Sequence, residues 1–401
     1  MLSVEEALNR ILGALQPVGA ETVALSEGWG RVLASPVLAR LTQPPADVSA
    51  MDGYAVRAAD ATEGARLTVI GAAPAGHPFA GKIGPGQAVR IFTGAVLPAG
   101  ADGILLQEDA EASGDEVAAK EAVQPGRWIR RAGLDFQLGE ELLPAGRKLT
   151  ARDIGLAAAA NHPWLGVHRA PRIGILATGD EISLPGEPLA PGGIVSSNAH
   201  ALAALVRSAG GAPLILPIAP DDAPAIAATA RAARGCDLLV TTGGASVGEH
   251  DLVQKALGPE GFALDFWKIA MRPGKPLIWG RLGDTPLLGL PGNPVSSLVC
   301  GIVFLWPAIA ALGGRPGLSP PVRRAILGAP LAGNDRRADY LRASLSTDAG
   351  GGWIATAFPR QDSSMLKTMA RADALLLRQP HAPPLEAGET VDVLILAELG
   401  V

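Results

Sequence analysis

Apolar and polar residues along this chain follow two different periods, and each change of period marks a change of predicted structure. Residues 4–15 have apolar side chains at helical spacing. Ser3 directly precedes this run and is spaced with Glu6 as a capping box. Thr150 and Asp153 form a second capping box, in front of an alanine-rich run that reaches about Ala160. We therefore expect a helix after each capping box.

The segment between these two helices has the pattern of a β-rich domain. From 42 to 138, short apolar runs alternate with turns rich in glycine and proline. This predicts an inserted β-rich domain, which divides a helical or linker domain into residues 1–41 and 139–170. After Pro316 the residues alternate again, so 317–401 are expected to form a small C-terminal β barrel or sandwich.

Residues 171–316 switch repeatedly between strand and helix patterns joined by short links. This is typical of a doubly wound α/β domain, in which helices cover both faces of a largely parallel sheet. The predicted fold class is therefore multidomain α/β plus β. The expected strands are 172–178, 213–218 and 237–241, the expected helices are 198–209 and 222–235, and the runs 276–280 and 286–291 are expected to pair as a hairpin.

The composition agrees with a multidomain globular protein and argues against binding to nucleic acid or to an anionic membrane. At 401 residues, of which 48% are apolar, the chain has enough material for roughly two to four domains with cores of their own. A net charge of −5 gives no basic surface of the kind that binds nucleic acid or an anionic membrane. We expect neither as a partner.

The cysteines and the longest apolar run also argue against a secreted or membrane protein. Cys236 and Cys300 have no CxxC spacing, so neither a disulfide framework nor a zinc site is indicated, and a reducing cytoplasm fits. The uncharged run 298–312 is shorter than the roughly 20 residues that a spanning helix needs, and Pro307 interrupts it. We expect a buried helix there.

The segment TTGGASVGEHD at 241–251 has the pattern of an anion-binding loop. A predicted buried strand runs into glycines and a serine, and a helix is expected near Asp251. Glycines let backbone N–H groups approach a ligand, and the positive end of a helix favours an anion. In a doubly wound sheet, ligands bind at such carboxyl ends of strands. The residues predicted for this loop are Gly243, Gly244, Ser246 and Gly248; the alternative is a tight turn that merely needs glycine.

Carboxylates follow several of the predicted strands. ATGDEI at 177–182 places two acids beside a glycine turn, and further acids follow the next two strands. Hard cations prefer oxygen ligands, so this edge of the sheet predicts a Mg²⁺ that bridges phosphates. Each acid taken alone has an alternative as a helix cap or a solvated charge. The residues concerned are Thr178, Gly179, Asp180, Glu181, Asp221 and Asp251.

Two further loops complete the predicted edge. MRPGKP at 271–276 has two cations around a Pro-Gly turn with a lysine just upstream, so three cations are expected to converge on an oxyanion; a solvated basic loop is the alternative. LPGNPVSS at 290–297 starts a helix with proline, and its free N–H groups can take a phosphate. The residues are Lys268, Arg272, Pro273, Gly274 and Lys275 in the first loop and Gly292 and Asn293 in the second.

Together these strings resemble the molybdopterin molybdenumtransferase family over essentially the whole chain. SAMDGYA at 49–55 and FTGA at 92–95 join TGDE, TTGGxSxGxxD, PGKP and LPGNPVS in the family's order. The resemblance implies a homodimer, with the active cleft between the α/β domain of one subunit and the inserted domain of the other. It places Asp52 and Thr93 across the dimer, Glu181, Asp221 and Asp251 at Mg²⁺ and the adenylylated substrate, and Lys268, Arg272, Arg342 and Ser363 at molybdate or the dithiolene.

The resemblance also implies the reaction. Molybdate would be inserted into adenylylated molybdopterin with Mg²⁺, and AMP would leave; positioning and electrostatic stabilisation would carry most of the catalysis. The molybdopterin adenylyltransferase and molybdoenzymes are the implied partners. Two other functions remain as alternatives: the sister adenylyltransferase, which needs neither the Asp52 segment nor the C-terminal barrel, and a catalytically silent scaffold or cofactor carrier.

The chain departs from the family pattern at two places. Arg272 stands where lysine is expected, and a planar guanidinium is not interchangeable with an ammonium, which bears on molybdate affinity and on selection against tungstate or sulfate. QDSS at 361–364, which contains Ser363, lacks the glycine of the usual QGS string.

Overall fold

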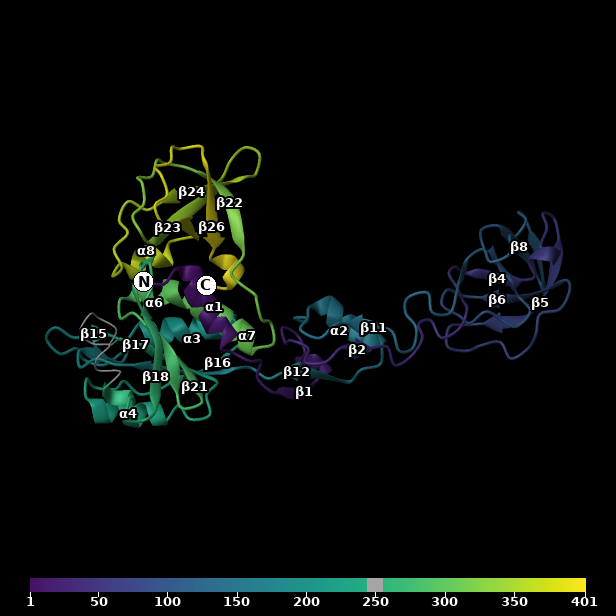
Figure 1. The fold of residues 1–401 in the computed structure, drawn as a ribbon. Coiled ribbons are helices and arrows are strands. Elements are labelled where there is room, and N and C mark those ends of the chain that lie inside the picture. The colour runs from purple at the N-terminus through teal and green to yellow at the C-terminus, as the bar shows by residue number, and fades with distance from the viewer. Residues whose placement is uncertain (244–254) are drawn as a thin grey trace.

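The computed structural model describes residues 1–243 and 255–401. Figure 1 shows an elongated molecule, with a C-terminal barrel stacked on an α/β domain at one end and a separate six-stranded sheet at the other. A small linking region joins the two ends, and the chain crosses it once outward and once on the return. This is the multidomain α/β plus β fold that the sequence predicts.

The α/β domain contains a mixed six-stranded sheet in the order β16-β13-β17-β21-β20-β18. The first four strands are parallel, while β20 and β18 run antiparallel to their neighbours. The predicted hairpin is confirmed, because β20 pairs with β21 across Leu282 and Thr285. The strands are β13 (Arg172–Ala177), β16 (Ala212–Ile215), β17 (Leu238–Thr242), β18 (Phe262–Lys268), β20 (Pro276–Leu282) and β21 (Thr285–Leu290).

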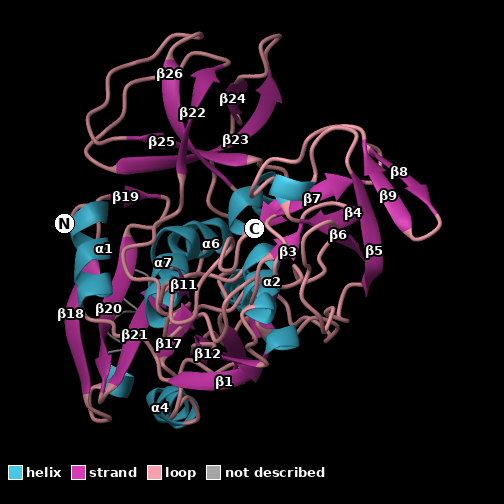
Figure 2. Cartoon of the chain, turned by 90° about the vertical axis from the view of Figure 1, so that its right-hand side faces the viewer, coloured by secondary structure: helices cyan, strands magenta, loops and turns pink. Residues whose placement is uncertain are grey.

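Helices cover both faces of this sheet, as a doubly wound domain requires. Successive side chains of a strand point to opposite faces, so Leu238 and Val240 join the core under α3, α6 and α7, whereas Leu239 joins the core under α4. In Figure 2, α6 and α7 lie between the barrel and strands β17 and β21. The helices are α3 (Asn198–Ser208), α4 (Ala223–Arg231), α6 (Pro294–Cys300) and α7 (Trp306–Leu312).

The uncharged run in the sequence is a core helix. Pro294–Leu312 forms one helical stretch that is apolar and long enough to cross a membrane by composition, but 89% of its most apolar window is buried inside the protein. A π-helical turn at Gly301–Leu305 precedes Pro307. Proline supplies no N–H to the helical ladder, and a widened turn accommodates that loss. The prediction of a buried helix is confirmed.

Both predicted capping boxes begin helices. α1 (Val4–Gly13) starts after Ser3, whose hydroxyl accepts the Glu6 N–H at 3.1 Å, and α2 (Ala151–Ala159) starts after Thr150 with a complete capping box. The apolar face of α1 packs into the core of the α/β domain. The linking region consists of α2 with β1 (Ala20–Ala24), β2 (Val37–Leu38), β11 (Glu141–Leu143) and β12 (Trp164–His168).

The distal sheet lies inside the segment predicted to be an inserted β-rich domain. Its order is β7-β4-β6-β5-β9-β8, and all its pairs are antiparallel except β5 with β6. Separate apolar clusters cover its two faces. The strands are β4 (Gly53–Val56), β5 (Arg66–Ala73), β6 (Gln87–Ile91), β7 (Gly103–Leu106), β8 (Ala110–Ser113) and β9 (Glu116–Ala119), with β3 (Val48–Ser49) and β10 (Ile129–Arg130) paired beside them.

The C-terminal strands close into the predicted barrel. The order β23-β24-β22-β26-β25 returns to its start because β25 also pairs with β23. A short strand from the α/β side, β19 (Met271–Arg272), pairs in parallel with β23 on the outside of this ring. The strands are β22 (Val322–Leu327), β23 (Ala338–Thr347), β24 (Trp353–Ala357), β25 (Ala374–Arg378) and β26 (Thr390–Ile395), and a short helix, α8 (Leu366–Ala370), precedes β25.

Candidate active site

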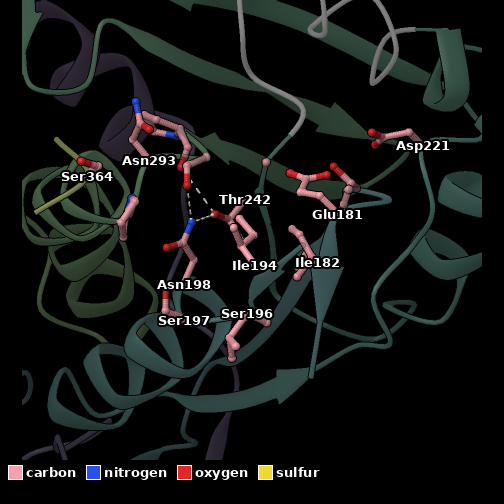
Figure 3. A pocket seen from close by; sticks show the side chains of 18 of the residues that line it. Glu181, Ile182, Ile194, Ser196, Ser197, Asn198, Asp221, Thr242, Asn293 and Ser364 are labelled. Atoms are coloured by element: carbon pink, nitrogen blue, oxygen red, sulfur yellow. Dashed lines mark hydrogen bonds between the residues drawn. The ribbon is translucent and has the colours of Figure 1, made fainter. Parts of the chain in front are cut away.

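A pocket of about 590 Å³ opens at the carboxyl ends of three neighbouring parallel strands, β13, β17 and β21. The strands end at Ala177, Thr242 and Leu290, and the turns that follow each strand form much of the wall. Seven residues predicted from the sequence line the pocket together: Thr178, Gly179, Glu181, Asp221, Gly243, Gly292 and Asn293. The side chains are shown in Figure 3.

The glycines at this edge allow the turns to pack closely. Gly243 has φ +91°, and a Cβ there would lie 2.5 Å from the Thr178 carbonyl oxygen. A Cβ on Gly179 would lie 2.6 Å from Oε2 of Glu181, because the carboxylate folds back over that glycine. Side chains at these two positions would fill space that the backbone and the carboxylate occupy. The glycines are therefore part of the construction of the pocket.

Asn198, at the start of α3, joins two of the turns. Its side-chain amide donates to Oγ1 of Thr242 at 2.9 Å and to the Gly292 carbonyl oxygen at 2.7 Å. These two bonds fix the orientation of the amide, because the nitrogen is identified by its two acceptors. Its carbonyl oxygen is left as an oriented acceptor at the pocket wall.

Two carboxylates lie toward one end of the pocket. In Figure 3, Glu181 and Asp221 are at the end opposite Asn293 and Ser364. Asp180 does not line the pocket; its Oδ1 accepts the Asp221 N–H at 3.0 Å and so holds the second acidic turn in place. Within residues 1–243 and 255–401, no cluster of three or more metal-binding His, Cys, Asp or Glu side chains is present.

The start of α6 is less open to an anion than the sequence suggests. Pro294 has no N–H, and the Val295 N–H donates to the Ser363 carbonyl oxygen at 3.1 Å. The prediction of free N–H groups is therefore wrong for these first two positions, because the segment 361–364 occupies the second. The same segment brings Ser364, rather than Ser363, to the lining of the pocket.

The three predicted cations of the 268–275 region do not form part of the pocket lining. Nζ of Lys268 lies 3.5 Å from the centroid of the Trp267 ring, and β18 places Lys268 opposite Pro276, which does line the pocket. Lys275 is exposed. Arg272 turns toward the barrel, where Asp339 accepts hydrogen bonds from two of its nitrogens.

The neighbouring Pro273-Gly274 turn packs against the core helix. The Arg272-Pro273 peptide bond is cis, and Gly274 has φ +116°. A Cβ on Gly274 would lie 2.3 Å from Sγ of Cys300. The turn is thus held against the C-terminal end of α6.

Arg342, on β23, is buried with 1% of its surface exposed. One terminal nitrogen donates to the Asp362 carbonyl oxygen at 2.9 Å, and its backbone N–H donates to Oε1 of Gln361 at 3.0 Å. Its Nε has no hydrogen-bond partner in the described part of the chain. Arg342 therefore organises the segment that contains Ser363 and Ser364.

Asp52 and Thr93 lie together, but in the distal sheet. Oδ1 of Asp52 accepts from the Thr93 N–H at 2.7 Å and from its hydroxyl at 2.8 Å. These two bonds, with Arg90 nearby, hold the pKa of Asp52 below its ordinary value. In Figure 1, the linking region separates this sheet from the α/β domain.

Four predicted site residues of the 241–251 loop, Gly244, Ser246, Gly248 and Asp251, lie outside the described residues, as does the helix expected near Asp251. Sequence reasoning missed Asn198, Thr242 and Ser364. A signal for Asn198 was present, because SSN at 196–198 marks the start of an amphipathic helix.

Comparison with known proteins decides the family. Three family models match in order: the MoeA N-terminal region (domain I and II) over 2–161, a probable molybdopterin binding domain over 174–311 and the MoeA C-terminal region (domain IV) over 324–396. A molybdopterin molybdenumtransferase of Nostoc sp. is 36% identical across 99% of this chain and 94% of its own length. The chain belongs to the molybdopterin molybdenumtransferase family.

Other members of this family agree in sequence and in fold. Molybdopterin molybdenumtransferase 2 of Mycobacterium tuberculosis is 38% identical over 94% of this chain and 95% of its own. The crystal structure of the molybdopterin biosynthesis MoeA protein from Pyrococcus horikosii has a TM-score of 0.87 at 30% identity, and the match covers 98% of this chain and 99% of that one. The chain is therefore a transferase of molybdenum cofactor biosynthesis, with molybdopterin and molybdenum as its substrates.

Proposed function

We propose that this transferase inserts molybdate into adenylylated molybdopterin in a Mg²⁺-dependent reaction that releases AMP. The observation that carries the proposal is the pocket itself: glycine turns at the ends of parallel strands, two carboxylates at one end and an oriented amide oxygen in the wall. Glycine turns bring backbone N–H groups to phosphate oxygens. A pocket of about 590 Å³ is also in the size range of small-molecule sites.

The donor set fits a magnesium ion. Glu181 and Asp221 supply carboxylate oxygens, which Mg²⁺ prefers, and Mg²⁺ sites commonly combine one or two carboxylates with substrate phosphates. The Thr178 hydroxyl is buried, and no partner for it is found among the described residues. When bound there, the ion would neutralise charge on the phosphoanhydride. Glu181 and Asp221 would hold it, with Asp251 as the third predicted ligand.

The remaining residues of the pocket bind and orient the substrate. The backbone of the Gly179 and Gly243 turns faces the phosphate, and the Asn198 carbonyl oxygen accepts from a donor on the substrate. Lys268, Lys275 and Arg342 lie outside the lining of this pocket, and in the proposal they supply positive charge for the molybdate oxyanion. The reaction needs no covalent nucleophile from the chain. Positioning of the substrate and preorganised electrostatic stabilisation of the transition state account for the rate.

A second copy of the chain completes the cleft in this proposal. The Asp52 and Thr93 pair is exposed to solvent at the far end of the molecule, and its polar groups suit a substrate held by another subunit. A C2 dimer would place two such pairs at two pockets, because the same surfaces are used on both subunits. A cytoplasmic location, with substrate from the adenylyltransferase and product passing to molybdoenzymes, belongs to the same proposal.

The reaction is tested with purified protein, adenylylated molybdopterin, Mg²⁺ and molybdate. AMP release that depends on molybdate is expected; AMP release without molybdate, or none with it, contradicts the proposal. A parallel mixture of molybdopterin and ATP tests the sister activity, and pyrophosphate release there would favour adenylyl transfer. A protein inactive in both mixtures would support a scaffold or carrier.

The shared cleft is tested by mixing two inactive variants, Asp52→Ala and Lys268→Ala. In a hybrid dimer, one cleft receives both intact residues and the other receives neither. With random exchange of subunits, about a quarter of the wild-type activity should return. Exchange is verified with two affinity tags, and full exchange without recovery of activity would rule out a cleft built from two subunits.

A further inference from the structure

The Arg272 guanidinium binds acidic and amide side chains of the protein, although 46% of the side chain is exposed. Its Nε donates to Oδ1 of Asp339 at 2.7 Å, and one terminal nitrogen donates to Oδ2 of the same carboxylate and to Oδ1 of Asn334 at 3.2 Å. The other terminal nitrogen lies 3.5 Å from Oδ2 of Asp335. Such a fork on a carboxylate is the strong, directional form of an ion pair. No nitrogen of this side chain is left without an acidic or amide partner.

This contact joins the α/β side of the molecule to the barrel. Arg272 lies on β19 and Asp339 on β23, where the two residues are register partners, and the Ala338 N–H donates to the Ala270 carbonyl oxygen at 2.9 Å. Only 6% of the Asp339 side chain is exposed, and among the described residues Arg272 is its ion-pair partner. A nearly buried carboxylate that loses its partner is strongly destabilising.

From Asp339 a continuous series of contacts leads to the pocket. Three residues further along β23, Arg342 binds the segment 361–364, and the Gln361 amide returns a hydrogen bond to the Arg342 carbonyl oxygen at 2.9 Å. The Ser363 carbonyl oxygen then accepts the Val295 N–H at the start of α6, and Ser364 lines the pocket. The position of the barrel thus sets the position of this wall.

We infer that Arg272 is a positioning residue that fixes the barrel on the α/β domain, so that segment 361–364 completes the pocket, and that it is not a ligand of the substrate oxyanion. The oxyanion's identity as molybdate rests on the proposed function. The positioning role itself rests on contacts between described residues.

Removing either partner distinguishes the two roles. If Arg272 is a positioning residue, Arg272→Ala and Asp339→Asn should have the same defect, and the double variant should be no worse than either. If Arg272 binds the oxyanion, Asp339→Asn should release the guanidinium and leave molybdate binding unchanged or tighter. Arg272→Lys, which keeps a charge but loses the fork, should behave like Arg272→Ala in the first case and like wild type in the second.

Two readouts are needed. Hydrogen exchange of the Val295 amide reports whether segment 361–364 is docked, and we expect it to become about tenfold faster or more in both single variants. Molybdate-dependent AMP release reports kcat and the KM for molybdate, and a positioning role predicts that kcat falls together with the docking. Unchanged Val295 exchange in Asp339→Asn would overturn the inference.

The barrel offers a matched control pair. Nε of Arg323 binds both oxygens of Glu398 at 3.1 Å, but the two side chains are 51% and 34% exposed. Arg323→Ala and Glu398→Gln should leave Val295 exchange and AMP release unchanged. If Arg272→Ala does not fold, Asp339→Asn and Arg272→Lys still decide the question. If the wild-type protein releases no AMP, the proposed function fails while the exchange experiment still tests the positioning role.

Discussion

The α/β sheet and the distal sheet each have six strands, yet they present their polar residues in different ways. In the α/β domain, neighbouring parallel strands end at one edge, and their turns enclose Glu181 and Asp221 in a pocket. In the distal sheet, nearly all pairs are antiparallel, and Asp52 and Thr93 form a single bonded pair on a partly open surface. Parallel strands concentrate loops at one edge, whereas antiparallel strands divide them between two. The first sheet therefore builds a concavity, and the second offers a pair that needs an opposing surface.

The largest effect is expected from the acids of the pocket. Glu181→Gln and Asp221→Asn remove charge from the end of the pocket where the proposed magnesium ion lies, with little change of shape. We expect each to lower molybdate-dependent AMP release by about a hundredfold or more, as for other preorganised charges. Glu63→Gln, at an exposed position of the distal domain, is the control and should be neutral. Full activity of Glu181→Gln would remove the metal site from the proposal.

Substitutions of two tightly packed glycines should break the two sheets in different ways. A Cβ on Gly243 would lie 2.5 Å from the Thr178 carbonyl oxygen, and one on Gly53 would lie 2.1 Å from the Leu105 carbonyl oxygen. Gly53→Ala should lower the free energy of unfolding of the distal sheet by about 3 kcal/mol. Gly243→Ala should instead distort the pocket and abolish ligand binding.

Chemical denaturation monitored by amide hydrogen exchange separates these outcomes, because it measures the unfolding of each sheet independently. Gly155→Ala is the control: a Cβ there meets nothing within 4 Å, and the residue lies inside α2. That change should be neutral or stabilise the protein by up to about 1 kcal/mol. Equal loss of protection in both sheets for Gly53→Ala would mean that the two ends of the molecule unfold as one unit.

The sequence predicts the edge of the α/β sheet well because its signals are local. A strand followed by glycine and an acid, as at Thr178 to Glu181, predicts both a turn and the chemistry of its side chains from a few neighbouring residues. The capping residues Ser3 and Thr150 are local in the same sense. These elements, and the residues that begin or end them, could therefore be predicted from the sequence.

The missed features depend on contacts between distant segments. Arg272 binds Asp339, which is 67 residues away, and no local pattern distinguishes that partner from an oxyanion. Burial of Arg342 and the choice of Ser364 over Ser363 follow from how the barrel docks on α6. The face of α1 was predicted, but not the core that it would join. Such features require the packed structure.

Ion pairs should contribute more to stability in the α/β domain than in the distal sheet. Arg169 binds both oxygens of Asp237, which is 15% exposed and also accepts the Arg172 N–H at 2.7 Å, so the pair fixes the first strand of the α/β sheet. Arg169→Ala should lower the free energy of unfolding by about 2 kcal/mol. Arg66 and Glu116 in the distal sheet are 70% and 55% exposed, and Arg66→Ala should change it by less than about 0.5 kcal/mol. Similar values for both in urea unfolding would contradict this difference.

The smallest effect is expected from the hydroxyl of Thr93. The Thr93 N–H and hydroxyl both donate to Asp52 and hold its pKa below the ordinary value of 3.8. Thr93→Val removes the hydroxyl bond and keeps the N–H bond, so the pKa of Asp52 should rise part of the way back. Stability from these bonds is present above pH 3.8 and is lost as the pH falls through the lowered pKa, so the variant should lose it at a higher pH than wild type. An NMR titration of the Asp52 carboxyl carbon measures this directly, with exposed Thr62→Val in the same domain as the control. An unchanged pKa would show that the N–H bond alone sets the ionisation of Asp52, and the hydroxyl would then be free to serve a substrate.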